Sequence, residues 1–173
     1  MARNIEIKAR IESIESVFQK AAGIADEGPI EIVQDDTFFL CENGRLKLRA
    51  FSENEGELIF YRRSDRIGPK ECFYLVSPTN SPGTLCETLS LAYGRAGRVR
   101  KKRTLFLAGR TRIHLDRVEG LGDFLELEVV LEDGEPIESG EAVAEDLMAK
   151  LGIRPDQLIE GAYVDLLASV TVE

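Results

Sequence analysis

The feature that most constrains the fold of this chain is a series of short runs in which charged and apolar side chains alternate. Residues 4–11, NIEIKARI, place isoleucine and alanine on one face and polar side chains on the other. Residues 45–49, RLKLR, place three cations on one face and two leucines on the other. Because successive side chains of a strand point to opposite faces, this period of two predicts β-strands, each with one charged face.

Turn signals and apolar spacing predict the remaining elements. Asn43-Gly44 is typical of a tight hairpin turn. Four short helices are expected at 16–22, 84–93, 139–151 and 155–167. The order of elements predicts an α+β protein, an eight-stranded antiparallel β-barrel with helices packed outside. Its strands are expected at 4–11, 31–40, 45–51, 57–63, 70–76, 97–107, 110–118 and 124–131.

Length and charge limit the class of protein. A chain of 173 residues is sufficient for one domain, expected over residues 1–173. The net charge of -9 argues against a nucleic-acid-binding surface and against an anionic membrane as partner. No apolar stretch has the length of a membrane span or a signal peptide, and the three cysteines show no CxxC spacing. We therefore expect a cytoplasmic protein and leave a homodimer open.

The charged strand faces admit two interpretations. For a single strand, a solvated outer face of an open sheet is the simpler one. Here cations recur on several strands together with carboxylates, which favours a closed sheet whose polar face points inward. Burying so many charges requires partner charges or a ligand. A polyphosphate with a divalent ion satisfies both signs, because Arg and Lys bind phosphate oxygens and carboxylates bind Mg²⁺ or Mn²⁺.

Several of these runs resemble the motifs of a known family. In residues 4–8, NIEIK, the second Glu and the Lys of an ExExK motif are present, and Asn4 replaces the first Glu. The other matching segments are RLKLR at 45–49, KKR at 101–103, TRIHLD at 111–116, ELE at 126–128 and GAYVDLL at 161–167. Taken in order, they resemble the CYTH family of triphosphate tunnel metalloenzymes, most closely its class IV adenylyl cyclase branch.

The resemblance implies roles for individual residues. Lys8 and Glu6 would be catalytic. The residues implied to bind the phosphate chain are Lys8, Arg45, Lys47, Arg49, Lys101, Arg103 and Arg112. The residues implied to hold Mg²⁺ or Mn²⁺ are Glu6, Asp116, Glu126 and Glu128.

The resemblance implies a metal-dependent enzyme acting on a triphosphate and leaves three functions open. The first hypothesis is cyclisation of ATP to cyclic AMP and pyrophosphate. The second is hydrolysis of inorganic tripolyphosphate or an organic triphosphate. The third is a triphosphate or nucleotide sensor without turnover, suggested by Asn4, because an amide lacks the charge and basicity of a carboxylate.

Three further positions have alternative interpretations. His114, the only histidine, is expected to satisfy a local hydrogen bond rather than to act as a general base. Asp35 and Asp36 are interpreted as polar strand residues, with a role as partners of the cations as the alternative. The sequence does not decide whether Arg62 or Arg63 points inward.

Overall fold

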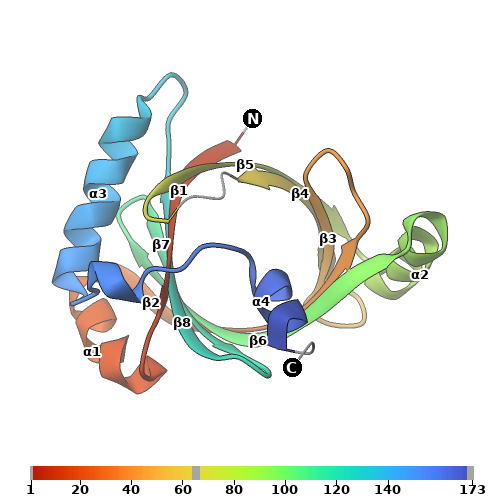
Figure 1. The fold of residues 1–173 in the computed structure, drawn as a ribbon, viewed down its shortest axis with the longest axis horizontal. Helices are drawn as coiled ribbons and strands as arrows, with labels where there is room; N and C mark the ends of the chain where they lie inside the picture. Colours follow the sequence, from red (N-terminus) through yellow and green to blue (C-terminus); the bar gives the residue numbers. More distant parts are fainter. Residues whose placement is uncertain (1, 64–66, 171–173) are drawn as a thin grey trace.

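The eight strands form one closed, tunnel-like antiparallel sheet (Figure 1). This is a computed structural model that describes residues 2–63 and 67–170. The strands are β1 (Ala2–Arg10), β2 (Glu27–Phe39), β3 (Arg45–Ala50), β4 (Gly56–Arg63), β5 (Lys70–Thr79), β6 (Arg95–Ala108), β7 (Thr111–Val118) and β8 (Gly122–Val130). The predicted α+β class with eight antiparallel strands is confirmed, and several strands are longer than the alternating runs.

Two meanders and one bridging strand close the sheet. The strand order is β1-β5-β4-β3-β2-β6-β7-β8. The strands β2–β5 and β6–β8 are the two meanders, and β2 pairs with β6 along most of its length. Strand β1 lies between β5 and β8, so that Lys8 is opposite Glu126 and Glu6 is opposite Glu128. The registers therefore bring the charged faces of strands far apart in the sequence onto one inner surface.

Helices α1 (Ile14–Ile24), α2 (Pro82–Tyr93) and α3 (Ile137–Lys150) lie outside the closed sheet (Figure 1). The side chain of Ser13 accepts a hydrogen bond from the backbone N–H of Ser16, which caps α1 two residues before the start predicted at residue 16. Helix α1 contacts β6 and β7, α3 contacts β1 and β8, and α2 contacts β2 and β3. Within the described ranges, no helix combines the length and the apolar character needed to cross a bilayer.

The main hydrophobic core lies between the outer face of the sheet and helices α1 and α3. It contains the apolar partners in the alternating runs, such as Ile5 and Ile7 of β1 and Ile113 and Leu115 of β7, all completely buried. Burial of these apolar side chains stabilises the packing of the helices on the sheet. The apolar face of the sheet thus packs against the helices, and the polar face lines the interior of the tunnel.

A second apolar cluster closes one end of the tunnel. Phe38, Val99, Val118 and Phe124 from the inner face pack against residues 162–164 at the start of helix α4 (Tyr163–Val170). Figure 1 shows the segment before α4 crossing the ring at this end. We refer to this group as the apolar plug. It makes the two ends of the tunnel unequal.

The single helix predicted over 155–167 is wrong. The structure has a 3-10 turn at Pro155–Gln157, an extended stretch, and only then α4. In the extended stretch, Leu158 pairs with Ala9, and the N–H of Ile159 donates to the carbonyl of Lys8. The chain breaks its helical pattern there because the end of β1 beyond β5 offers free backbone groups that must be hydrogen bonded.

Candidate active site

The inner face of the sheet surrounds a cavity of about 330 Å³. Every strand contributes side chains at alternate positions, as the period of two requires. Among the described residues, seven cations and five carboxylates line the cavity, so its net charge is opposite to that of the whole molecule. The cations are Lys8, Lys47, Arg49, Arg63, Lys101, Arg103 and Arg112, and the carboxylates are Glu6, Asp36, Glu57, Glu126 and Glu128.

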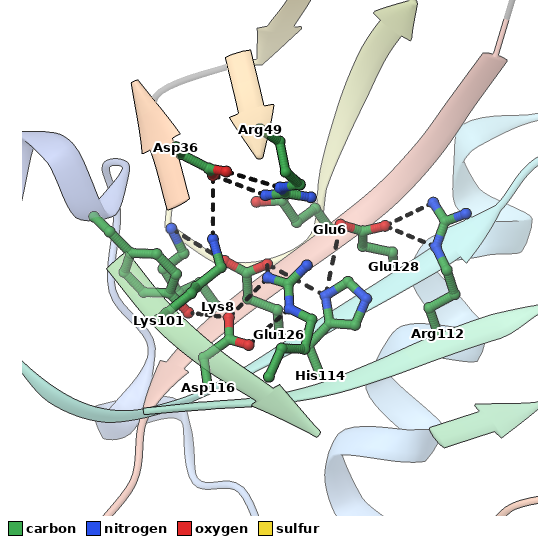
Figure 2. Close-up of polar contacts among 12 residues, drawn as sticks. Glu6, Lys8, Asp36, Arg49, Lys101, Arg112, His114, Asp116, Glu126 and Glu128 are labelled. Atoms are coloured by element: carbon green, nitrogen blue, oxygen red, sulfur yellow. Dashed lines mark hydrogen bonds and ion pairs between the residues drawn. The ribbon is translucent and has the colours of Figure 1, made fainter. Parts of the chain in front are cut away.

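Asp36 of β2 is the centre of a buried cationic cluster (Figure 2). Arg49 binds both of its oxygens, at 2.8 and 2.9 Å, and the Nζ atoms of Lys47 and Lys101 lie 3.0 and 3.4 Å from Oδ2. Although burial opposes ionisation, Lys101, Lys47 and Arg49 hold the pKa of Asp36 well below its usual range. Asp36 is therefore a buried partner of the cations, and its interpretation as a plain polar strand residue is wrong. Asp35, on the outer face, pairs with Arg98 instead.

Burial has the opposite effect on Lys101. Its side chain is 3% exposed, and burial lowers its pKa to about 7, with Arg49, Arg103 and Lys47 adding to the shift and Asp36 opposing it. A phosphate oxygen brought to this position would favour the charged form of the lysine. The cluster around Asp36 is thus short of negative charge.

Arg103 is held by a second buried carboxylate. Its Nε and Nη2 donate to the two oxygens of Asp116 at 2.7 and 2.8 Å, and Nη2 also lies 3.3 Å from Oε2 of Glu126. The hydroxyl of Tyr163 donates to Asp116 at 2.9 Å. Asp116 therefore orients Arg103 and binds the plug, and both of its oxygens are occupied.

Lys8 lies between Glu126 and the plug. Its Nζ is 3.3 Å from Oε1 of Glu126, donates to the carbonyl of Gly161 at 3.1 Å, and lies 4.0 Å from the centroid of the Tyr163 ring. Burial opposes ionisation of Glu126, but Lys8, His114 and Arg103 hold its pKa well below the usual range. At neutral pH, Glu126 is therefore an ionised carboxylate in the wall of the cavity.

One group of side chains in the wall fits a divalent ion. Donor atoms of His114, Glu126 and Glu128 all lie within 4.8 Å of one another. Arg112 binds Oε2 of Glu128 through two nitrogens, at 2.9 and 2.6 Å, which leaves Oε1 on the side of His114 (Figure 2). Two ionised carboxylates and an imidazole are a donor set that divalent ions accept. These residues could therefore hold the metal ion that the resemblance implies.

The other two predicted metal ligands lie in ion pairs outside this group. Glu6 pairs with Arg63, and Asp116 with Arg103. Arg63 is thus the inward-pointing residue of the Arg62–Arg63 pair, whereas Arg62 donates to the carbonyl of Asn43 at the surface. The sequence contained a signal for Arg63: it lies two residues after Tyr61 and four after Ile59 on β4, and alternate residues of a strand share one face.

Arg45 lies outside the main cavity. It pairs with Asp165 of α4 at 2.6 Å and lines a smaller hollow of about 240 Å³ with residues that include Arg62 and Arg63. The remaining predicted phosphate-binding residues all line the main cavity. Sequence reasoning missed Gln34, whose buried Oε1 has no hydrogen-bond partner within the described chain; its position two residues before Asp36 is the signal that could have found it.

A closed antiparallel tunnel with a cationic and carboxylate-bearing interior defines the class of protein, and the comparisons with known proteins agree. The sequence matches the CYTH domain family over residues 2–163. The chain therefore belongs to the CYTH family. No curated protein sequence matches it significantly.

Solved structures share the fold over almost their whole length. The PH1012 protein of Pyrococcus horikoshii is 24% identical, with a TM-score of 0.83 over 95% of this chain and 99% of that one. A conserved hypothetical protein of Pyrococcus furiosus is 20% identical, with a TM-score of 0.83 over 94% and 99%. A Vibrio parahaemolyticus protein described as a candidate adenylate cyclase is 18% identical, with a TM-score of 0.74 over 95% and 97%. These likenesses show the fold.

Proposed function

We propose that this protein is a divalent-metal-dependent enzyme that acts on a triphosphate bound inside the tunnel. The observation that carries the proposal is the convergence of Lys47, Arg49, Lys101 and Arg103 on one cavity that also presents two ionised carboxylates. Cations of this kind bind phosphate oxygens, and Arg does so through two parallel hydrogen bonds. The excess of positive charge in the wall complements the net negative charge of a metal-bound triphosphate.

The chemistry of such a site is mainly electrostatic. Phosphoryl and nucleotidyl transfer require that charge on the phosphate oxygens be neutralised and that the attacking and leaving oxygens be held in line. When bound, the metal ion would polarise the phosphate and neutralise developing charge. Arg103 and Arg49 are suited to hold the phosphate chain still, because Asp116 and Asp36 fix their guanidinium groups.

The tunnel end away from the plug supports a substrate with an organic part. Ile32 and Leu105 lie on β2 and β6, six residues from the plug residues Phe38 and Val99, and therefore towards the other end. Ile59 and Val76, which pair across β4 and β5, also line the cavity. A phosphate chain among the cations would leave a base or ribose against these side chains. This arrangement favours a nucleoside triphosphate over inorganic tripolyphosphate.

Cyclisation of ATP is the reaction we propose first. The ribose 3′-oxygen would attack the α-phosphorus, lose its proton and displace pyrophosphate. Asn4 supports this order over hydrolysis, because its buried amide oxygen lines the cavity without the negative charge that would help to activate water. A triphosphatase that releases phosphate remains the second candidate, since both reactions use the same cations and carboxylates.

The test is product analysis with ATP and Mn²⁺ or Mg²⁺ and the purified full chain. Cyclic AMP with equimolar pyrophosphate is expected, whereas phosphate release without cyclic AMP would assign the triphosphatase, and no product from ATP or tripolyphosphate would overturn an enzymatic function. Lys47→Gln should reduce turnover at least about tenfold, because it removes a cation from the cavity. Lys102→Gln is the matched control, since Lys102 directly follows Lys101 on β6 and is exposed on the outer face of the sheet.

The location follows from the same proposal. ATP and divalent ions are abundant in the cytoplasm, and the three cysteines of the chain are free thiols, as a reducing compartment would keep them. We therefore propose a cytoplasmic enzyme with a small-molecule triphosphate as its partner.

A further inference from the structure

His114 occupies a costly position unless something binds it. It lies on the inner face of β7, its side chain is 5% exposed, and its Nδ1 makes no hydrogen bond within the described residues. The expectation that His114 satisfies a local hydrogen bond is therefore not met at Nδ1. A buried polar atom without a partner costs about 1–3 kcal/mol, so this nitrogen is prepared for a ligand that completes it.

The nearest atoms to this nitrogen are carboxylate oxygens. Nδ1 lies 3.5 Å from Oε2 of Glu126 and 3.8 Å from Oε1 of Glu128. These separations are too long for good hydrogen bonds, but they suit three donors that share one ion with bonds of about 2.0–2.2 Å. Figure 2 shows the imidazole pointing towards both carboxylates.

The neighbouring cations orient both carboxylates. Lys8 is closest to Oε1 of Glu126, and Arg112 takes Oε2 of Glu128. Oε2 of Glu126 faces His114 and also lies 3.3 Å from Nη2 of Arg103. Oε1 of Glu128 faces His114, while the other oxygen of Glu128 is held by Arg112. Such outer contacts orient metal ligands and strengthen a site.

We propose that His114 is a ligand of the divalent ion through Nδ1, together with Glu126 and Glu128, and that the site prefers Mn²⁺, Co²⁺ or Zn²⁺ to Mg²⁺. The inference rests on the proposed function, because the ion is the one that would accompany the triphosphate. Mg²⁺ strongly favours oxygen donors and a full octahedral shell, whereas imidazole nitrogen suits the transition ions. The nitrogen of His114 therefore sets the choice of metal.

Pulsed electron paramagnetic resonance of bound Mn²⁺ tests the assignment directly. The full chain, expressed without a histidine tag and treated with a chelator, is loaded with Mn²⁺ in the presence of tripolyphosphate. We expect nuclear modulation from an imidazole ¹⁴N. Because the chain has a single histidine, labelling histidine with ¹⁵N must change that modulation, and no substitution is needed.

Variants measure the preference for the metal. His114→Gln should abolish the nitrogen modulation and weaken Mn²⁺ binding by at least about tenfold, with a much smaller effect on Mg²⁺. Gln34→Met is the matched control, because the buried Oε1 of Gln34 also lacks a partner within the described chain but lies outside the group of His114, Glu126 and Glu128. Mn²⁺ bound to this variant should keep the nitrogen modulation.

Two failures are distinguishable. Mn²⁺ bound without nitrogen modulation in the unsubstituted protein, or a modulation that ¹⁵N-histidine leaves unchanged, would overturn the role of His114 and leave the proposed function standing. Absence of any Mn²⁺ or Mg²⁺ binding, with or without tripolyphosphate, would overturn the metal-dependent function itself.

Discussion

At the scale of single residues, the most consequential side chain is Asp36. It is 1% exposed and is the shared partner of Lys47, Arg49 and Lys101. Without it, three cations would face one another in a site with little water. Asp36 therefore stabilises the folded tunnel, and it also limits the positive charge that a bound polyanion meets.

Asp36→Asn should lower the free energy of unfolding by about 3–5 kcal/mol, because it leaves buried cations without their counter-charge. Urea denaturation of the full chain measures the change. Asp35→Asn is the neighbouring control: its pair with Arg98 is exposed, so the loss should be at most about 1 kcal/mol. Equal losses in the two variants would contradict the role of Asp36.

Lys101 predicts a dependence of stability on pH. Burial lowers its pKa from 10.5 to about 7 in the folded protein, so between pH 7 and pH 10.5 the unfolded chain carries a proton at Lys101 that the folded chain has lost. Stability increases with pH wherever the unfolded state binds more protons. Well below pH 7, burial of the charged Lys101 lowers the free energy of unfolding by its full amount. As pH rises above 7, the folded protein loses this proton and the free energy of unfolding increases.

The melting temperature should show this relief by comparison with Lys101→Met. The difference, unsubstituted protein minus variant, should become more positive from pH 7 to pH 9. Lys102→Met, an exposed position on the same strand, should give a difference that does not change over this range. A flat difference for Lys101→Met would show that the lysine does not titrate in this window.

At the scale of elements, the segment from residue 158 to helix α4 decides the shape of the tunnel. Its backbone pairs with β1, its Tyr163 binds Asp116, and its Val164 packs in the apolar plug. Gly97 of β6 allows this close approach: it has a φ of +155°, and a Cβ there would lie 2.4 Å from Cγ2 of Val164. The close packing of α4 on β6 therefore requires a glycine at position 97.

Gly97→Ala should lower the free energy of unfolding by about 1–3 kcal/mol and expose α4 to proteolysis, because the added methyl group collides with Val164. Adding Val164→Ala should recover part of this loss, a coupling that a double-mutant cycle measures. Gly97→Ala with unchanged stability and unchanged cleavage near the C-terminus would contradict the close packing of α4.

At the scale of the whole molecule, the sign of the charge differs between outside and inside. The chain carries a net charge of -9, yet the cavity wall has more cations than carboxylates among its described residues. The acidic surface repels large polyanions, whereas the interior attracts a small one that can enter. The charge distribution therefore favours anions that are small enough to enter the tunnel over large polyanions that meet only the surface.

Tripolyphosphate with Mn²⁺ should raise the melting temperature, corresponding to about 2.7 kcal/mol at one hundred times the dissociation constant. A single-stranded oligonucleotide at the same phosphate concentration should give no shift, because its chain meets the acidic exterior. Thermal shift assays compare the two ligands. Equal stabilisation by both would mean that phosphate binds outside the tunnel.

Much of the fold and most of the candidate site could be predicted from local pattern. Alternation in 4–11, 45–51 and 124–131 specified which side chains share a face, and the structure places these faces inside and outside as expected. Lys102 and Arg100 also lie on the exposed side of β6, as their phase requires. Which residues of a strand share a face depends only on the alternation along that strand, so it can be predicted from the sequence.

The sequence by itself thus determined the strands, their two faces and the polar interior of this protein. Only the tertiary structure decided which inward side chains meet: Lys101 reaches Asp36 across 65 residues of chain, and Tyr163 reaches Asp116 across 47. It also broke the helix expected over 155–167 and directed Nδ1 of His114 at two carboxylates. The physical reason is that partners depend on how the closed sheet staggers its strands, and that stagger is set by pairing between distant segments rather than by any one of them.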